Sequence, residues 1–188
     1  MSFPYIVLDL ETTGLSKHYH KITEIAAVKV KDKKIVDEFQ TLVNPKVSIP
    51  PFITKLTGIN NKMVESAPTL SKVLPHFIDF LKEDVIIAHN ATFDYGFIDH
   101  NKKKYLEEGL INDRICTRRL ANRLLPDLPS KKLGTICQHF NIINSQAHRA
   151  MSDVLATNEV FLNFQNLMEE KGIKEKKEVI KFQNSPRK

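Results

Sequence analysis

The order of the apolar segments constrains the fold of this chain more than any other feature of its sequence. A short apolar run at residues 5–10 has the length of a buried strand. Two longer segments, 22–30 and 35–43, flank the polar turn 31–34 and predict a β-hairpin beside that strand. Segment 44–51 carries three prolines without a period, so we expect a loop there. The start of the chain therefore predicts three neighbouring strands.

Beyond the hairpin, short strands are expected to alternate with helices. Val85–Ala88 and Ile115–Cys116 are brief apolar segments between polar neighbours, as in buried strands. Helices are predicted at residues 68–81, 91–108, 117–125, 133–140 and 150–170. Strands that first form a meander and then alternate with helices predict an α/β fold, with a mixed five-stranded sheet flanked by helices.

The composition is that of an ordinary globular domain. The 188 residues are 41% hydrophobic and 27% charged, which excludes collagen-like, disordered and transmembrane classes. No cationic segment precedes the first apolar run, so we expect no signal peptide, a cytoplasmic protein and no membrane partner. The two cysteines, Cys116 and Cys137, support neither a disulfide framework nor a thiolate metal site.

The positive charge is concentrated at the end of the chain. The formal net charge is +6, and residues 171–188 hold 7 basic and 2 acidic residues, so residues 1–170 are close to neutral. We therefore expect one domain over residues 1–170 and a basic, flexible C-terminal tail over 171–188. This tail is interpreted as solvated, with a linker or a peptide that folds on a partner as alternatives.

Two acids follow the first apolar run. Asp9 and Glu11 are two residues apart on the expected strand, so their side chains leave the same face while Leu10 points into the core. A hard cation such as Mg²⁺ or Mn²⁺ between the two carboxylates would relieve their repulsion. The alternative is a solvated strand end before the turn 12–14. An Asp-x-Glu pair alone favours that simpler interpretation.

Two further acids lie at the starts of predicted helices. Asp94 follows the strand Val85–Ala88 by a short turn, which places it at the carboxyl end of that strand, where α/β sheets build their sites. Alone, it is more typical of an acid that the helix dipole favours at a helix start. Asp153 lies in the last long helix, where an exposed salt-bridge partner is the alternative. His148 precedes Asp153 by five residues, so we expect it at the helix entry rather than beside Asp153 as a second ligand.

Three segments together carry a specific resemblance. Residues 7–14 (Val-Leu-Asp-Leu-Glu-Thr-Thr-Gly), 89–94 (His-Asn-Ala-Thr-Phe-Asp) and 148–153 (His-Arg-Ala-Met-Ser-Asp) resemble the three motifs of the DEDDh (DnaQ-like) 3′→5′ exonucleases. The chain is most similar to the branch that holds the proofreading epsilon subunit of bacterial DNA polymerase III. The resemblance covers residues 4–168 and implies the ribonuclease H-like exonuclease fold.

The resemblance also implies a catalytic centre. In the family, residues matching Asp9, Glu11, Asp94 and Asp153 ligate two Mg²⁺ or Mn²⁺ ions, and the residue matching His148 is the general base. Two such ions can stabilise both the attacking and the leaving oxygen at phosphorus. Histidine suits the base because its ordinary pKa of about 6.5 leaves much of it neutral near pH 7. The implied products are nucleoside 5′-monophosphates.

Contacts with the terminal nucleotide are implied by the same resemblance. Thr12 and the backbone near Gly14 would meet the nucleotide, Leu56 and Phe93 would pack against bases, and Asn90 would organise the site. For Leu56 and Phe93, ordinary core packing stays open as an alternative. Thr57 stands where relatives often carry histidine, which leaves its contact with the strand end an open question.

Three functions remain open from the sequence. The first is a metal-dependent 3′→5′ DNA exonuclease, plausibly proofreading, that acts on single-stranded or frayed 3′ ends and joins a DNA polymerase subunit. The second is an exoribonuclease of the ribonuclease T or oligoribonuclease kind. The third is a non-catalytic module that binds a polymerase or nucleic acid. A basic stretch is interpreted either as a phosphate contact or as a solvated surface; it comprises Arg118, Arg119, Arg123, Lys131 and Lys132.

Overall fold

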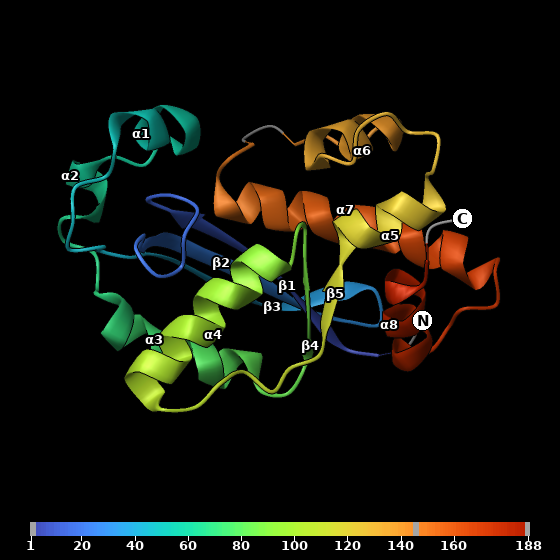
Figure 1. The fold of residues 1–188 in the computed structure, drawn as a ribbon, viewed down its shortest axis with the longest axis horizontal. Helices are drawn as coiled ribbons and strands as arrows, with labels where there is room; N and C mark the ends of the chain where they lie inside the picture. Colours follow the sequence, from blue (N-terminus) through green and yellow to red (C-terminus); the bar gives the residue numbers. More distant parts are fainter. Residues whose placement is uncertain (1–2, 145–146, 187–188) are drawn as a thin grey trace.

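A five-stranded sheet forms the centre of the molecule (Figure 1). The structure is a computed structural model that describes residues 3–144 and 147–186. The strands are β1 (Tyr5–Thr12), β2 (Ile22–Lys31), β3 (Lys34–Leu42), β4 (Val85–Ala88) and β5 (Arg114–Cys116), in the spatial order β3-β2-β1-β4-β5. β1, β2 and β3 pair antiparallel, whereas β1, β4 and β5 run parallel. The prediction of a mixed five-stranded sheet is confirmed.

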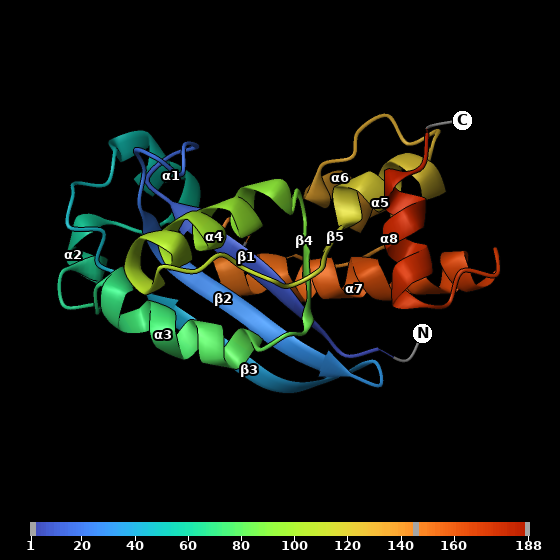
Figure 2. The same cartoon turned by 60° about the horizontal axis from the view of Figure 1, so that its bottom comes forward.

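Helices cover both faces of the sheet. They are α1 (Pro51–Thr57), α2 (Asn61–Val64), α3 (Leu70–Leu81), α4 (Thr92–Leu106), α5 (Thr117–Leu124), α6 (Leu133–His139), α7 (Ala150–Glu169) and α8 (Lys176–Asn184). Figure 2 shows α3 and α4 on one face, and α7 with α5, α6 and α8 on the other. The five predicted helices are confirmed within a few residues at their ends, whereas α1, α2 and α8 were not predicted. None of the helices in the described ranges is long and apolar enough to cross a membrane.

The alternation of side chains along β1 determines which layer of helices the Asp9 side chain faces. Tyr5 and Val7 pack into the core formed with α5, α6, α7 and α8. Ile6 and Leu8 point the other way and pack with α3 and α4. Since the side chains of a strand alternate, Asp9 continues the first series and faces the layer that contains α7. The apolar core thus aims the carboxylate at the start of α7.

Helix α8 corrects the prediction of a flexible tail. Val179 and Gln183 are buried in the fold. The Gln183 side chain accepts a hydrogen bond from the Cys116 N–H (2.8 Å) and donates one to the Arg114 carbonyl (2.8 Å). These are the backbone groups that the edge strand β5 would otherwise leave unpaired. The prediction was wrong for residues 176–184 because the charge count hid the apolar side of the helix, to which Val179 belongs.

Candidate active site

Three carboxylates meet at the end of β1. Asp9 and Glu11 project from β1, and Asp153 comes from the first turn of α7. One oxygen from each of the three lies within 4.8 Å of the others. Burial of Ala150 and Val154 against the sheet fixes this end of α7 over the strand. The structure therefore brings together acids that are about 140 residues apart in the sequence.

Asp94 reaches the same strand end from the opposite layer. It lies in the first turn of α4, is only 3% exposed, and accepts a hydrogen bond from the Leu10 N–H at 3.1 Å. It lies outside the compact trio of Asp9, Glu11 and Asp153, yet its charge is the largest Coulombic contribution acting on Asp9. The four predicted acids thus surround the end of β1 from both sides.

Burial and mutual repulsion oppose ionisation of these acids. Burial raises the pKa of Asp9 well above its ordinary value, and Asp94 and Glu11 raise it further. For Glu11 burial and repulsion, with Asp153 as the largest Coulombic contributor, raise the pKa to about 8. Burial raises the pKa of Asp94 to about 7. A cluster of hard oxygen ligands that repel one another is the donor set that suits Mg²⁺ or Mn²⁺.

Hydrogen bonds orient the Asp153 carboxylate. The Asn144 amide donates to Oδ1 at 2.6 Å, and the His148 backbone N–H donates to Oδ2 at 2.9 Å. The Ser152 hydroxyl in turn donates to the Asn144 carbonyl oxygen at 2.6 Å. Sequence analysis missed Asn144, since an asparagine nine residues before an acid has no periodic relation to it. Its role depends on the contact between its side chain and Asp153, which becomes evident only in the folded structure.

His148 lies at the entry of α7, where it was expected. It precedes the helix by two residues, is exposed, and has a left-handed backbone with φ of 66°. His148 and Asp153 both line a cleft of about 750 Å³, together with Asp9 and Asn90. The φ of Asn90 is 71°, so two non-glycine residues of this cleft are held in a conformation that is costly for side chains with a Cβ.

An ion pair beside the centre was also missed. Glu24 on β2 is paired in register with Glu11 and is 1% exposed. Its carboxylate accepts hydrogen bonds from the Arg149 guanidinium (3.0 and 3.3 Å) and from the Ala150 N–H (3.2 Å). Glu24 therefore holds the first residues of α7 against the sheet. The signal in the sequence was an acid inside an otherwise apolar strand, which needs a partner when buried.

The residues implied to meet the terminal nucleotide have different surroundings. Thr12 is buried, and its hydroxyl donates to the Gly14 carbonyl at 2.7 Å. A Cβ at position 14 would lie 2.3 Å from the His20 ring, so the close turn requires glycine. Asn90 is exposed in the cleft, and Phe93 is partly buried with its ring centroid 4.9 Å from that of Phe97. Their contacts with substrate stay predictions.

Helix α1 presents Leu56 and Thr57 in opposite ways. Leu56 is 51% exposed, whereas Thr57 is buried. The Thr57 hydroxyl donates to the Ile53 carbonyl at 3.0 Å and accepts from the Ile59 N–H at 3.1 Å. Leu56 is thus available to a ligand, while the Thr57 hydroxyl is engaged in closing the end of α1. Thr57 remains only a predicted contact of the strand end.

His89 links the end of β4 to the next two segments. Its Nε2 lies 3.0 Å from the Lys131 carbonyl, which can only accept, so Nε2 carries the proton. Its Nδ1 lies 2.9 Å from the Thr117 hydroxyl. Burial lowers the pKa of His89 to about 4, which keeps the ring neutral. His89 therefore has a structural role, because its two ring nitrogens connect the end of β4 to Thr117 and to Lys131.

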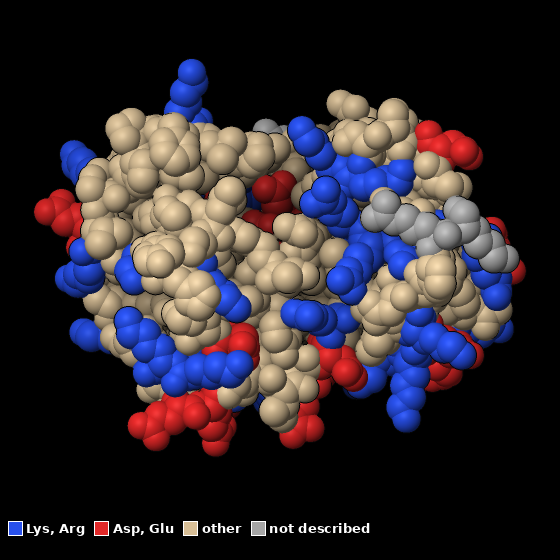
Figure 3. Space-filling model, in the orientation of Figure 1, with Lys and Arg blue, Asp and Glu red and all other residues tan. Residues whose placement is uncertain are grey.

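Acidic and basic side chains form separate groups around a hollow in the face shown in Figure 3. In Figure 3, acidic side chains lie at the bottom of a hollow near the middle of the face, and Lys and Arg side chains gather beside it over α5. A polyanion would thus meet positive charge next to the carboxylates.

Comparison with known proteins defines the class. The sequence model of a family described as "Exonuclease" matches residues 6–161, and the chain belongs to this family. It is 45% identical over 175 residues to the DNA polymerase III PolC-type of Caldanaerobacter subterraneus subsp. tengcongensis, covering 93% of this chain but 12% of that protein. The chain therefore spans about an eighth of the length of this PolC-type relative. The DNA polymerase III subunit epsilon of Aquifex aeolicus is 35% identical over 84% of this chain and 78% of that subunit.

Solved structures of exonucleases share the fold. Exonuclease X, in complex with 5′ overhanging duplex DNA, superimposes with a TM-score of 0.76 and 25% identity, covering 96% of this chain and 99% of that one. The nuclease domain of 3′hExo, a DEDDh family member bound to rAMP, gives a TM-score of 0.75 at 19% identity over 88% of this chain and 92% of that one. The predicted ribonuclease H-like exonuclease fold is confirmed.

Proposed function

We propose that this chain is a metal-dependent 3′→5′ exonuclease that hydrolyses DNA to nucleoside 5′-monophosphates. The observation that carries the proposal is the convergence of four carboxylates from β1, α4 and α7 on one strand end, beside a histidine on the cleft wall. Membership in the exonuclease family supports the hydrolytic reaction. A non-catalytic module would have no need for acids held together against their mutual repulsion.

Each residue has a defined task in this reaction. Asp9, Glu11, Asp94 and Asp153 would hold two divalent cations, which supply charge stabilisation to the attacking and leaving oxygens. His148 removes a proton from the attacking water as its oxygen bonds to phosphorus. The bond from phosphorus to the 3′ oxygen of the neighbouring nucleotide breaks, and that oxygen takes up a proton. The hydrogen bond from the backbone N–H of His148 to the Asp153 carboxylate fixes the position of the base relative to the carboxylates.

The relatives support DNA as the substrate and a polymerase as the partner. The similar proteins are DNA polymerase III PolC-type and subunit epsilon, and Exonuclease X was solved with DNA. We infer that this chain acts on single-stranded or frayed 3′ ends, in proofreading beside a DNA polymerase subunit. Because those relatives are bacterial replication proteins, we also infer a cytoplasmic location.

A direct assay tests the chemistry. The purified chain is incubated with Mg²⁺ or Mn²⁺ and a single-stranded DNA oligonucleotide, and products are resolved by chromatography. We expect nucleoside 5′-monophosphates from the first time points, shortening of a 5′-labelled strand one residue at a time, and no products in excess EDTA. Cleavage only at internal phosphodiester bonds, or hydrolysis that persists in EDTA, would contradict the proposal. A matched RNA digested more than tenfold faster would reject DNA as the substrate.

A further inference from the structure

A series of connected hollows leads away from the carboxylate centre. The main cleft shares Asn90, Arg118 and Lys131 with a second hollow of about 400 Å³. That second hollow shares Thr92 and Arg119 with a third, of about 410 Å³, which ends against α8. The surface is therefore continuous from Asp9 and Asp153, across the start of α5, to the C-terminal helix.

The walls of this path are basic. Its cationic side chains, which we call the basic groove, are Arg114, Arg118, Arg119, Lys131 and Lys132. Outside the carboxylate centre, Asp113 in the third hollow is the one acid among the described residues that line the three hollows. It forms an ion pair with Lys176 at 2.7 Å. The positive charge of the groove is thus not cancelled by its own walls.

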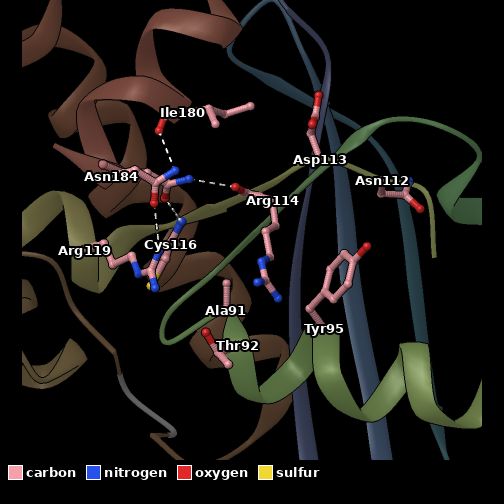
Figure 4. Close-up of a pocket in the computed structure, with 11 residues that line it drawn as sticks. Ala91, Thr92, Tyr95, Asn112, Asp113, Arg114, Cys116, Arg119, Ile180 and Asn184 are labelled. Atoms are coloured by element: carbon pink, nitrogen blue, oxygen red, sulfur yellow. Dashed lines mark hydrogen bonds between the residues drawn. The ribbon is translucent and has the colours of Figure 1, made fainter. Parts of the chain in front are cut away.

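Several groove side chains are fixed in position. Figure 4 shows Arg114 extending toward Thr92 and Tyr95 in the third hollow. The Arg114 guanidinium lies 5.0 Å from the centre of the Tyr95 ring, a cation–π contact. Arg119 donates to the Asn184 side chain at 2.8 Å, and Gln183 joins that helix to β5. A groove whose charges are held in place loses less entropy when it binds a ligand.

We propose that the basic groove binds phosphates of the substrate strand upstream of the scissile bond, so that the strand crosses α5 toward α8. This inference rests on the proposed function, because it takes the 3′ end to lie at the carboxylates. A strand with one negative charge on each nucleotide matches a row of cations, and groups that contact phosphate bind without regard to sequence. An acidic protein segment would match the charge, but it would have no reason to continue into the carboxylate centre.

Binding of oligothymidines of two lengths tests the groove without requiring hydrolysis. Kd is measured by fluorescence anisotropy in Ca²⁺ for a trinucleotide and a dodecanucleotide. In the unaltered chain we expect the longer strand to bind at least about tenfold more tightly and with a steeper salt dependence, by about 0.7 in log–log slope for each added phosphate contact. Equal affinities and equal slopes for the two lengths would overturn the proposal.

Charge-removing variants locate the contact. Arg114→Gln with Arg118→Gln is expected to weaken binding of the dodecanucleotide about tenfold, the sum of two exposed charge contacts, and to reduce its salt slope. Lys72→Gln removes one charge from an exposed position on α3 and should leave Kd within about twofold. If the double variant and the Lys72 variant bind the dodecanucleotide with the same Kd, the substrate strand does not lie in the basic groove. Arg118→Gln alone, at an exposed helix position, gives the same test should the double variant fail to fold.

The two proposals fail separately. Length-dependent binding without release of mononucleotides would reject the exonuclease reaction and support the groove. Release of mononucleotides with no dependence of Kd on length or on Arg118 would keep the exonuclease and reject the groove.

Discussion

The carboxylate centre and the contact between β5 and α8 both join segments that are far apart in the sequence. They differ in whether their polar groups attract or repel one another. In the first, Asp9, Glu11 and Asp153 are held within 4.8 Å although burial and repulsion raise the pKa of Asp9 and Glu11. In the second, Gln183 forms hydrogen bonds with two backbone groups of the edge strand, the Cys116 N–H and the Arg114 carbonyl. The comparison teaches that the centre reduces stability until a cation binds, whereas the helix contact stabilises the fold by itself.

The largest expected effect is on activity at the centre. Asp9→Asn should reduce kcat about 10³-fold, because it removes a cation ligand and metal ions supply several kcal/mol of transition-state stabilisation. Asp79→Asn, at an exposed position of α3, is the matched control and should keep activity within about twofold. Mononucleotide release in Mn²⁺ measures both. An Asp9 variant that retains a tenth of the activity or more would contradict the assignment.

Removal of the base should have the next largest effect. His148→Gln is expected to lower kcat about 10²-fold with little change in KM, because the side chain moves a proton and does not hold the cations. Mononucleotide release measured over a range of substrate concentrations gives kcat and KM for the variant. A loss in kcat of less than about threefold would show that another group accepts the proton.

Cations should stabilise the protein, and more so at high pH. The pKa of Glu11 is about 8 in the folded chain against 4.5 for the free side chain. The metal-free fold therefore binds more protons than the unfolded chain, and the resulting stability is present below pH 4.5 and lost as pH rises through 8. Bound Mn²⁺ replaces those protons. At about 100 times its Kd it should add about 2.7 kcal/mol.

Thermal unfolding measures this shift. The rise in Tm on adding Mn²⁺ should grow between pH 5 and pH 8, and it should shrink in the Asp9→Asn variant. That variant should also unfold at a higher temperature than the unaltered chain in EDTA at pH 8. A Tm shift that is independent of pH would show that the carboxylates are not the cation site.

The contact of α8 with β5 should affect the stability of the fold. Gln183→Leu leaves the Cys116 N–H and the Arg114 carbonyl without partners, which should cost about 2 kcal/mol of unfolding free energy. Gln138→Leu, at an exposed position of α6, should change it by less than about 0.5 kcal/mol. Urea titration compares the two. Equal stability of the two variants would mean that α8 contributes nothing through Gln183.

The sequence predicted what depends on local periodicity. The alternation of strand residues placed Asp9 and Glu11 on one face, and the position of Asp94 after β4 placed it at the same edge of the sheet. The helical period located α7, and with it Asp153. Each of these depends on a few neighbouring residues and on the general geometry of α/β sheets.

The features that were missed depend on distant partners. Glu24 and Arg149 are 125 residues apart, and neither indicates the other before the fold is known. Gln183 gains its role only from the unpaired edge of β5. In α8 the basic residues dominate the composition, although a capping box formed by Glu175 and Glu178 marks the helix start.

The most direct test of the carboxylate centre is the position of bound cations. A crystal of the chain soaked with Mn²⁺ and a nucleoside 5′-monophosphate should give two anomalous peaks, roughly 3.5–4 Å apart, in contact with Asp9, Glu11, Asp94 and Asp153. The phosphate should lie between the peaks and the His148 side chain. Peaks at other residues, or no peak at the end of β1 with saturating Mn²⁺, would contradict the account.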